Sequence, residues 1–203
     1  AASDVYKRQA YNTGIIRDLK IEGGSITGLS RVGGIVSINK GTIENCHNNI
    51  TTINISSTSG GGGIAASNRG GIITYCSNKA NITASQAGYV GGIVGGIQDN
   101  ATVSYCYNTG NIQANDQVGG IVGGGSKNSI IKCCYNTGKI EGRGTSSGTS
   151  NTNSGGIVGS FNGKVISCYN TGTVKGKSCV GGVVGQAVGN EGIQIVSCYN
   201  IGS

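Results

Sequence analysis

The sequence has no proline, methionine or tryptophan, one phenylalanine, one histidine and only 11% charged residues. General acid and base catalysis needs at least two titratable groups that converge in a cleft. The few carboxylates fall at mostly different places along the chain, so their spacing gives no sign of such a pair. We therefore expect no catalytic residues.

Patterns for metals, nucleotides and nucleic acids are missing as well. The sequence has no Cys-x-x-Cys pair, and its only histidine is His47, so no zinc site is expected. It lacks the phosphate-binding pattern Gly-x-x-x-x-Gly-Lys-Ser/Thr. The net charge of +7 is spread without a basic cluster, which disfavours a nucleic-acid partner. We expect no cofactor, no nucleic-acid partner and no membrane-inserted segment.

The chain instead repeats itself. Its forty glycines would suggest a flexible linker if the apolar residues were not periodic. A Cys-x-Asn step recurs six times at intervals of 28 to 34 residues, which indicates a repeat architecture. Between these steps lies a Gly-Gly-(Ile/Val) core, written most fully as VGGIVG at residues 90–95. The recurring residues are Cys46, Cys76, Cys106, Cys134, Cys168 and Cys198, and then Asn48, Asn78, Asn108, Asn136, Asn170 and Asn200.

Each repeat contains three short apolar segments, for example around Ile112, at 118–122 and at 130–134. Ile and Val favour strands, and no segment has helical periodicity. The sequence therefore predicts an all-β fold, a parallel β-solenoid (β-helix) of about six stacked coils with three short strands per repeat of about 30 residues. An apolar residue also lies three positions before each cysteine, so a bend or a bulge must separate these two inward-facing columns.

The recurrent asparagines and cysteines are interpreted as structural ladders. Asparagine amides stacked at one corner are expected to hydrogen-bond from coil to coil, with Asn12 as the remnant of an earlier coil. Stacked cysteines about 4.8 Å apart have parallel Cβ vectors that suit a disulfide poorly, so buried free thiols are expected. Glu141 aligns with Lys175 one coil later, which predicts an exposed ion pair between them.

A tyrosine stands between cysteine and asparagine in four consecutive repeats. If its neighbours point inward, this column points outward, and the flat rings are a candidate surface for sugar rings or a peptide. The alternative is that the rings only cover the corner. The candidate binding strip is Tyr107, Tyr135, Tyr169 and Tyr199. Two longer insertions, at residues 49–61 and 143–154, are expected to emerge at one shared corner.

Residues 1–9, AASDVYKRQ, are interpreted as a processing scar, because a DNA string that looks like a transposase sequencing adapter encodes them. Residues 10–203 are then expected to form one repeat domain, truncated at both ends.

The unit VGGIVG followed by CYNTG, at residues 90–110 and again at 118–138, resembles the GLUG repeat. GLUG repeats occur in large secreted or surface-attached bacterial proteins, including adhesin-like proteins and non-catalytic stretches of IgA-cleaving zinc metallopeptidases. The resemblance implies a non-catalytic structural or adhesive module, extracellular or on the bacterial cell surface, with a glycan or an extracellular protein as candidate partner besides flanking repeats of the same chain. The alternative is an accessory region of a larger secreted enzyme, such as a peptidase of that kind, whose catalytic domain lies elsewhere; its zinc-binding HExxH pattern is absent here.

Overall fold

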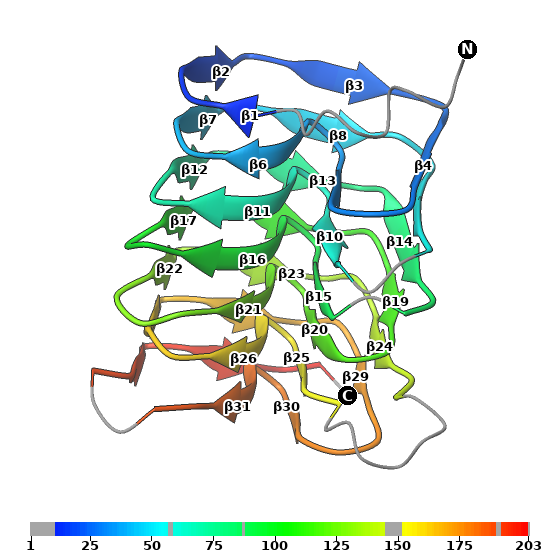
Figure 1. Ribbon diagram of the computed structural model, residues 1–203. Coiled ribbons are helices and arrows are strands. Elements are labelled where there is room, and N and C mark those ends of the chain that lie inside the picture. Colours follow the sequence, from blue (N-terminus) through cyan, green and yellow to red (C-terminus); the bar gives the residue numbers. More distant parts are fainter. Residues whose placement is uncertain (1–10, 57–58, 87, 145–151, 190–191, 203) are drawn as a thin grey trace.

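The computed structural model describes residues 11–56, 59–86, 88–144, 152–189 and 192–202. Over these residues the chain winds into a parallel β-solenoid without helices, and each turn stacks on the one before it (Figure 1). Six full turns are followed by the first three strands of a seventh. The predicted all-β solenoid of about six coils is confirmed. The interpretation of residues 1–9 as an adapter scar concerns a segment outside the described residues.

Each full turn contributes one strand to each of five parallel sheets, which we name A to E in chain order. Sheet A contains β1 (Tyr11–Asn12), β6 (Val36–Asn39), β11 (Ala65–Arg69), β16 (Val94–Gln98), β21 (Val122–Gly125), β26 (Val158–Phe161) and β31 (Val184–Ala187). Sheet B contains β2 (Ile15–Arg17), β7 (Thr42–Glu44), β12 (Ile72–Thr74), β17 (Thr102–Ser104), β22 (Ile130–Lys132), β27 (Lys164–Ile166) and β32 (Gln194–Val196).

The remaining three sheets complete each turn. Sheet C contains β3 (Lys20–Glu22), β8 (His47–Asn49), β13 (Ser77–Asn78), β18 (Tyr107–Asn108), β23 (Tyr135–Asn136), β28 (Tyr169–Asn170) and β33 (Tyr199–Asn200). Sheet D contains β4 (Ser25–Gly28), β9 (Thr52–Ile55), β14 (Asn81–Ala84), β19 (Ile112–Ala114), β24 (Ile140–Gly142) and β29 (Val174–Lys175). Sheet E contains β5 (Val32–Gly33), β10 (Gly61–Gly62), β15 (Tyr89–Gly91), β20 (Gln117–Gly119), β25 (Ser154–Gly155) and β30 (Val180–Gly181).

The prediction of three strands per repeat is wrong, because two of the predicted segments each contain a bend. The segment 118–122 bends at its glycine pair, so β20 ends at Gly119 and β21 begins at Val122. The segment 130–134 bends at Cys133, whose φ of 52° is left-handed. A residue in this left-handed conformation precedes every recurrent cysteine, and it forms the bend between the two inward-facing columns. These residues are Asn45, Tyr75, Tyr105, Cys133, Ser167 and Ser197.

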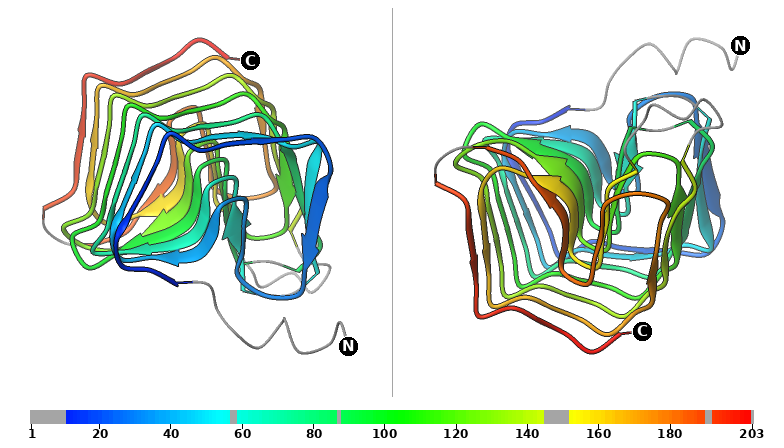
Figure 2. Two further views of the ribbon diagram at one scale, coloured as in Figure 1. Left: turned by 90° about the horizontal axis from the view of Figure 1, so that it is seen from above. Right: turned by 90° about the horizontal axis from the view of Figure 1, so that it is seen from below.

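The glycine pair is the place where the chain passes from one hydrophobic core to another. One core contains Ile93, Val103 and the recurrent cysteines, and the second contains Val90 and Ile112. Residues on either side of the pair, such as Val90 and Ile93, therefore point into different cores. Viewed along the axis, the turns superpose and each is divided into two lobes (Figure 2).

Between the two cores, the recurrent asparagines form a continuous amide ladder, as predicted. Each Nδ2 donates to the Oδ1 of the asparagine one turn later, from Asn48 to Asn200, at 2.7–3.1 Å. From Asn78 onward each Nδ2 also donates to the backbone carbonyl two residues later, at 2.7–3.0 Å. Both amide hydrogens are thus satisfied, which a buried asparagine requires.

Asn12 does not belong to this ladder, contrary to the prediction. It pairs with Asn39 in sheet A, where Asn12, Asn39 and Asn68 form a second, shorter amide ladder with Nδ2–Oδ1 distances of 2.8 Å. The Tyr11-Asn12 dipeptide matches the recurrent Tyr-Asn step only in its letters. The short ladder ends at Ile97, which replaces asparagine in the next turn.

The recurrent cysteines are free thiols, and all but Cys198 are fully buried. Each thiol donates to the carbonyl two residues before it, as Cys106 Sγ does to Ser104 O at 3.1 Å. Burial raises the pKa of the Cys106 thiol well above its ordinary value. Since the thiolate is the reactive form, the Cys106 thiol is expected to be unreactive at neutral pH.

Thiol labelling is expected to separate two groups of cysteines in the folded protein. Cys133, Cys179 and Cys198 are partly exposed and should react with a maleimide within minutes. The buried cysteines of the column should react only when the protein unfolds. Peptide mass spectrometry after timed labelling measures both groups, and labelling of Cys106 as fast as Cys133 in native buffer would contradict the buried column.

Candidate binding surfaces

Four tyrosines form a row on the outside of sheet C. The cysteine before each tyrosine and the asparagine after it are directed inward, so the tyrosine between them faces outward, as predicted. Successive ring centroids are 5.0, 5.0 and 5.1 Å apart, and successive ring planes differ by 4°, 5° and 4°. We call Tyr107, Tyr135, Tyr169 and Tyr199 the tyrosine row.

Within the tyrosine row, the rings cover one another's faces. Tyr135 lies between two parallel neighbours, so it presents its edge and hydroxyl to solvent more than an open ring face. Burial, and after it the phenols of Tyr107 and Tyr169, raise the pKa of Tyr135 above its ordinary value. Ligand binding by the row stays a prediction, and the stacking favours contacts with ring edges and hydroxyl groups.

A second aromatic stack was missed by the sequence reasoning. Tyr75 and Tyr105 occupy the left-handed position before the recurrent cysteine, and their rings are 4.9 Å apart with planes that differ by 9°. Both are exposed. The signal was present in the sequence, because both tyrosines directly precede the cysteine in successive repeats, but only two copies share it. Cys133 follows in the same column.

The predicted ion pair between Glu141 and Lys175 is wrong, although their register is as predicted. Glu141 pairs instead with Lys139 at 2.9 Å and with Arg143 at 3.6 Å, both on its own turn. Hydrogen bonds from Lys139 and then Gln113 lower the pKa of Glu141 to about 2. Lys139 directly precedes strand β24 and lies two residues before Glu141, so this lysine on the same turn pairs with Glu141 in place of Lys175.

The two insertions both end at the connection from sheet D to sheet E, which is the shared corner that was predicted. Part of the first is strand β9, so the connection itself is residues 56–60. Much of the second, 145–151, lies outside the described residues.

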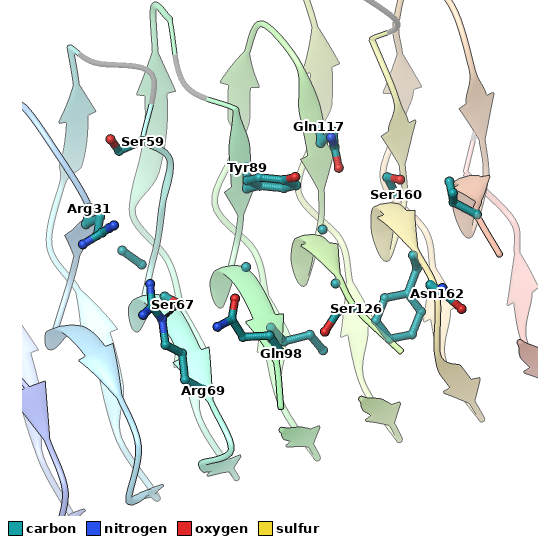
Figure 3. Close-up of a pocket in the computed structure, with 17 residues that line it drawn as sticks. Arg31, Ser59, Ser67, Arg69, Tyr89, Gln98, Gln117, Ser126, Ser160 and Asn162 are labelled. Carbon is teal, nitrogen blue, oxygen red and sulfur yellow. Dashed lines mark hydrogen bonds between the residues drawn. The ribbon is translucent and has the colours of Figure 1, made fainter. Parts of the chain in front are cut away.

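A groove of about 530 Å³ runs along the solenoid between sheets A and E (Figure 3). Its floor is one column of small residues in register on four successive strands of sheet A: Ser67, Gly96, Gly124 and Ser160. Tyr89 and Gln117, paired in sheet E, form one wall. The groove is open because the residues of the floor column are small, and larger side chains there would fill it. This column can be found in the sequence by aligning the turns.

The groove has a mixed lining, in which Ile97, Phe161 and Val188 lie beside polar groups, and two cations lie at one end. Arg31, Ser67 and Arg69 lie at that end, and Ser160 and Asn162 lie at the other (Figure 3). Among the described residues, neither guanidinium forms an ion pair with a carboxylate. No Asp, Glu or His is among the described residues that line the groove. The arrangement suits hydrogen bonding to a polar or anionic ligand.

Comparison with known protein families matches the GLUG motif to residues 86–113. The match extends from just before β15 into β19 and so includes one glycine pair, one cysteine and one asparagine of the ladder. The resemblance to GLUG repeats is therefore confirmed for this segment. No curated protein and no solved structure matches the chain.

The described residues contain no group of three or more His, Cys, Asp or Glu side chains placed to hold a metal ion. Within the same residues there is no helix of sufficient length and apolarity to cross a membrane.

Proposed function

We propose that the chain is a non-catalytic structural and adhesive module of a secreted or surface-attached bacterial protein. It acts as a stiff spacer and offers its lateral surfaces to a glycan or an extracellular protein. The observation that carries this proposal is the unbroken register: five parallel sheets join every full turn to the next, and the amide ladder continues from the second turn to the seventh. The GLUG motif supports the extracellular setting.

Continuous neighbour-to-neighbour contact explains the spacer role. In a repeat array each turn is stabilised by its two neighbours, so an interior turn cannot move without breaking two interfaces. Here each interface between full turns contains backbone hydrogen bonds in all five sheets and a buried side-chain hydrogen bond between asparagines. A ligand held on the lateral surface is therefore held at a fixed distance from either end of the solenoid.

The adhesive part of the proposal predicts that binding depends on the tyrosine row. Replacing all four tyrosines with Phe should weaken adhesion by about tenfold, because the hydroxyl groups are the polar atoms that the stack leaves exposed. Replacing them with Ala should abolish it. The measurement is binding of the wild-type and variant chains to an array of glycans and extracellular matrix proteins.

The control is the neighbouring outward column, with Thr109, Thr137 and Thr171 changed to Ala, which should bind like the wild type. Circular dichroism checks that each variant keeps its β-sheet signal. If the wild type binds an array component and the Phe and Ala variants bind it equally well, the tyrosine row has no adhesive role.

A further inference from the structure

We propose that the groove between sheets A and E binds an extended anionic polysaccharide, whose acidic groups bind Arg31 and Arg69. This site is separate from the tyrosine row, and it gives the solenoid a ligand of defined chemistry beyond its role as a spacer.

The shape of the groove suits a linear polymer. Its floor column continues through four turns, from Ser67 to Ser160, and the turns are about 4.8 Å apart as in any parallel sheet. This spacing is close to the length of one sugar residue in an extended chain. A polysaccharide lying along the axis therefore advances by about one sugar residue per turn over a floor of small residues.

The charge of the groove selects an anionic chain. Arg69 Nε donates to Ser67 Oγ at 3.4 Å, and no described carboxylate pairs with Arg31 or Arg69. Both guanidinium groups are only partly buried, so an incoming carboxylate or sulfate pays little desolvation and can bind in bidentate fashion. Two carboxylates adjoin lining residues along the chain, Asp99 after Gln98 and Asp116 before Gln117. Asp99 accepts a hydrogen bond from Gln98 Nε2 at 3.2 Å.

Tyr89 provides the stacking surface that the tyrosine row lacks. One side of its ring lies against the backbone of Gly124, where an added Cβ would overlap the ring. Among the described residues no other aromatic ring stacks on Tyr89, and the residue is 47% exposed. An aromatic face that is open on one side is what the apolar face of a sugar ring packs against.

Amides and hydroxyl groups complete the lining. Gln98 and Gln117 come from sheets A and E, and Ser126 and Ser160 lie farther along the groove (Figure 3). Amide side chains both donate and accept hydrogen bonds, as sugar hydroxyl groups do. An acidic peptide is the less suitable occupant, because the groove floor is the face of sheet A and not a strand edge that could pair with a peptide backbone.

The test is isothermal titration of the whole chain with polygalacturonate oligomers, dextran sulfate, neutral galactan oligomers and polyglutamate. We expect binding to polygalacturonate, to dextran sulfate or to both, with the two arms separating carboxylate from sulfate recognition. Arg31→Gln with Arg69→Gln should weaken that binding at least about tenfold. Tyr89→Ala should weaken it about fivefold, and Tyr89→Phe should leave it within about twofold.

The matched control carries the same loss of two positive charges on sheet B, through Arg17→Gln and Lys132→Gln, and should bind like the wild type. An equal loss in this control would overturn the site and indicate general charge attraction. Absence of binding to both sugar polyanions, or equal affinity for galactan, overturns the proposal. Equal or tighter binding of polyglutamate that depends on Arg31 and Arg69 assigns the groove to an acidic peptide instead.

Discussion

Gly92→Ala is expected to lower the free energy of unfolding by about 3 kcal/mol, although it adds a single methyl group. Gly92 is the second glycine of its pair, and an added Cβ would overlap the carbonyl oxygen of Gly120 one turn later and the side chain of Asn108. Neither obstacle can move aside, since the first is hydrogen-bonded backbone and the second is fixed in the amide ladder. Urea denaturation followed by circular dichroism measures the loss.

Gly96→Ala is the matched control in the same turn. A Cβ on Gly96 would meet only Gly124 O, at 3.9 Å, which is an ordinary contact. Neither glycine has a positive φ, so the two substitutions differ in packing and not in backbone strain. Gly96→Ala should leave stability unchanged or raise it by up to about 1 kcal/mol, because alanine restricts the unfolded chain. Equal effects of the two changes would refute the close packing at the glycine pair.

The position of Gly92 in the middle of the array adds a second expectation. Cooperativity in a solenoid comes from the interfaces between neighbouring turns, and this substitution weakens the interface that Gly92 forms with the following turn. Turns before and after the substitution should then unfold less cooperatively, which is seen as a broader urea transition with a smaller apparent m-value.

The stacking of like residues could be predicted from sequence because it is a property of the period alone. Residues one repeat apart occupy the same place in successive turns, so Cys106 and Asn108 could be assigned to inward columns without knowledge of the path of each turn. The outward direction of Tyr107 followed from strand alternation between them.

The path of each turn could not be predicted in the same way. The left-handed residues at the bends before the recurrent cysteines are as different as Asn45, Tyr75 and Cys133. A positive φ at these positions therefore could not be predicted from residue type. Tyr11 and Asn12 match the recurrent Tyr-Asn step of sheet C in sequence, but they lie in sheet A. The dipeptide alone predicted the wrong sheet, because the register is set by the following turns and the first turn is not a full copy of the repeat.

The groove was missed because it depends on how two sheets meet. Ser67 and Tyr89 are brought together by the angle between sheets A and E, and no short motif contains both. The sequence predicted that the tyrosine row faces outward, but it did not predict the orientation of the rings. Neighbouring rings stack face to face, and this stacking depends on side-chain torsion angles that the repeat pattern does not determine.

Asn108→Ala is expected to cost about 3 to 5 kcal/mol of unfolding free energy. Asn108 is fully buried, donates to Asn136 Oδ1 and Gly110 O, and accepts from Asn78 Nδ2. Its removal leaves a cavity and deprives the Asn78 and Asn136 amides of partners in a place that water does not reach. Unsatisfied buried polar groups of this kind cost roughly 1–3 kcal/mol each.

Asn108→Leu distinguishes hydrogen bonding from volume, because leucine has nearly the shape of asparagine and none of its polar atoms. The cavity is then filled while the two neighbouring amides remain unpartnered, so most of the loss should persist. Asn200→Ala is the control within the same column, since Asn200 is exposed and water can replace its hydrogen bonds to Asn170 and Gly202; it should cost less than about 1 kcal/mol. Wild-type stability of Asn108→Leu would show that the ladder fills space without holding the turns together, and the rigidity on which the spacer role depends would then have to come from the five sheets alone.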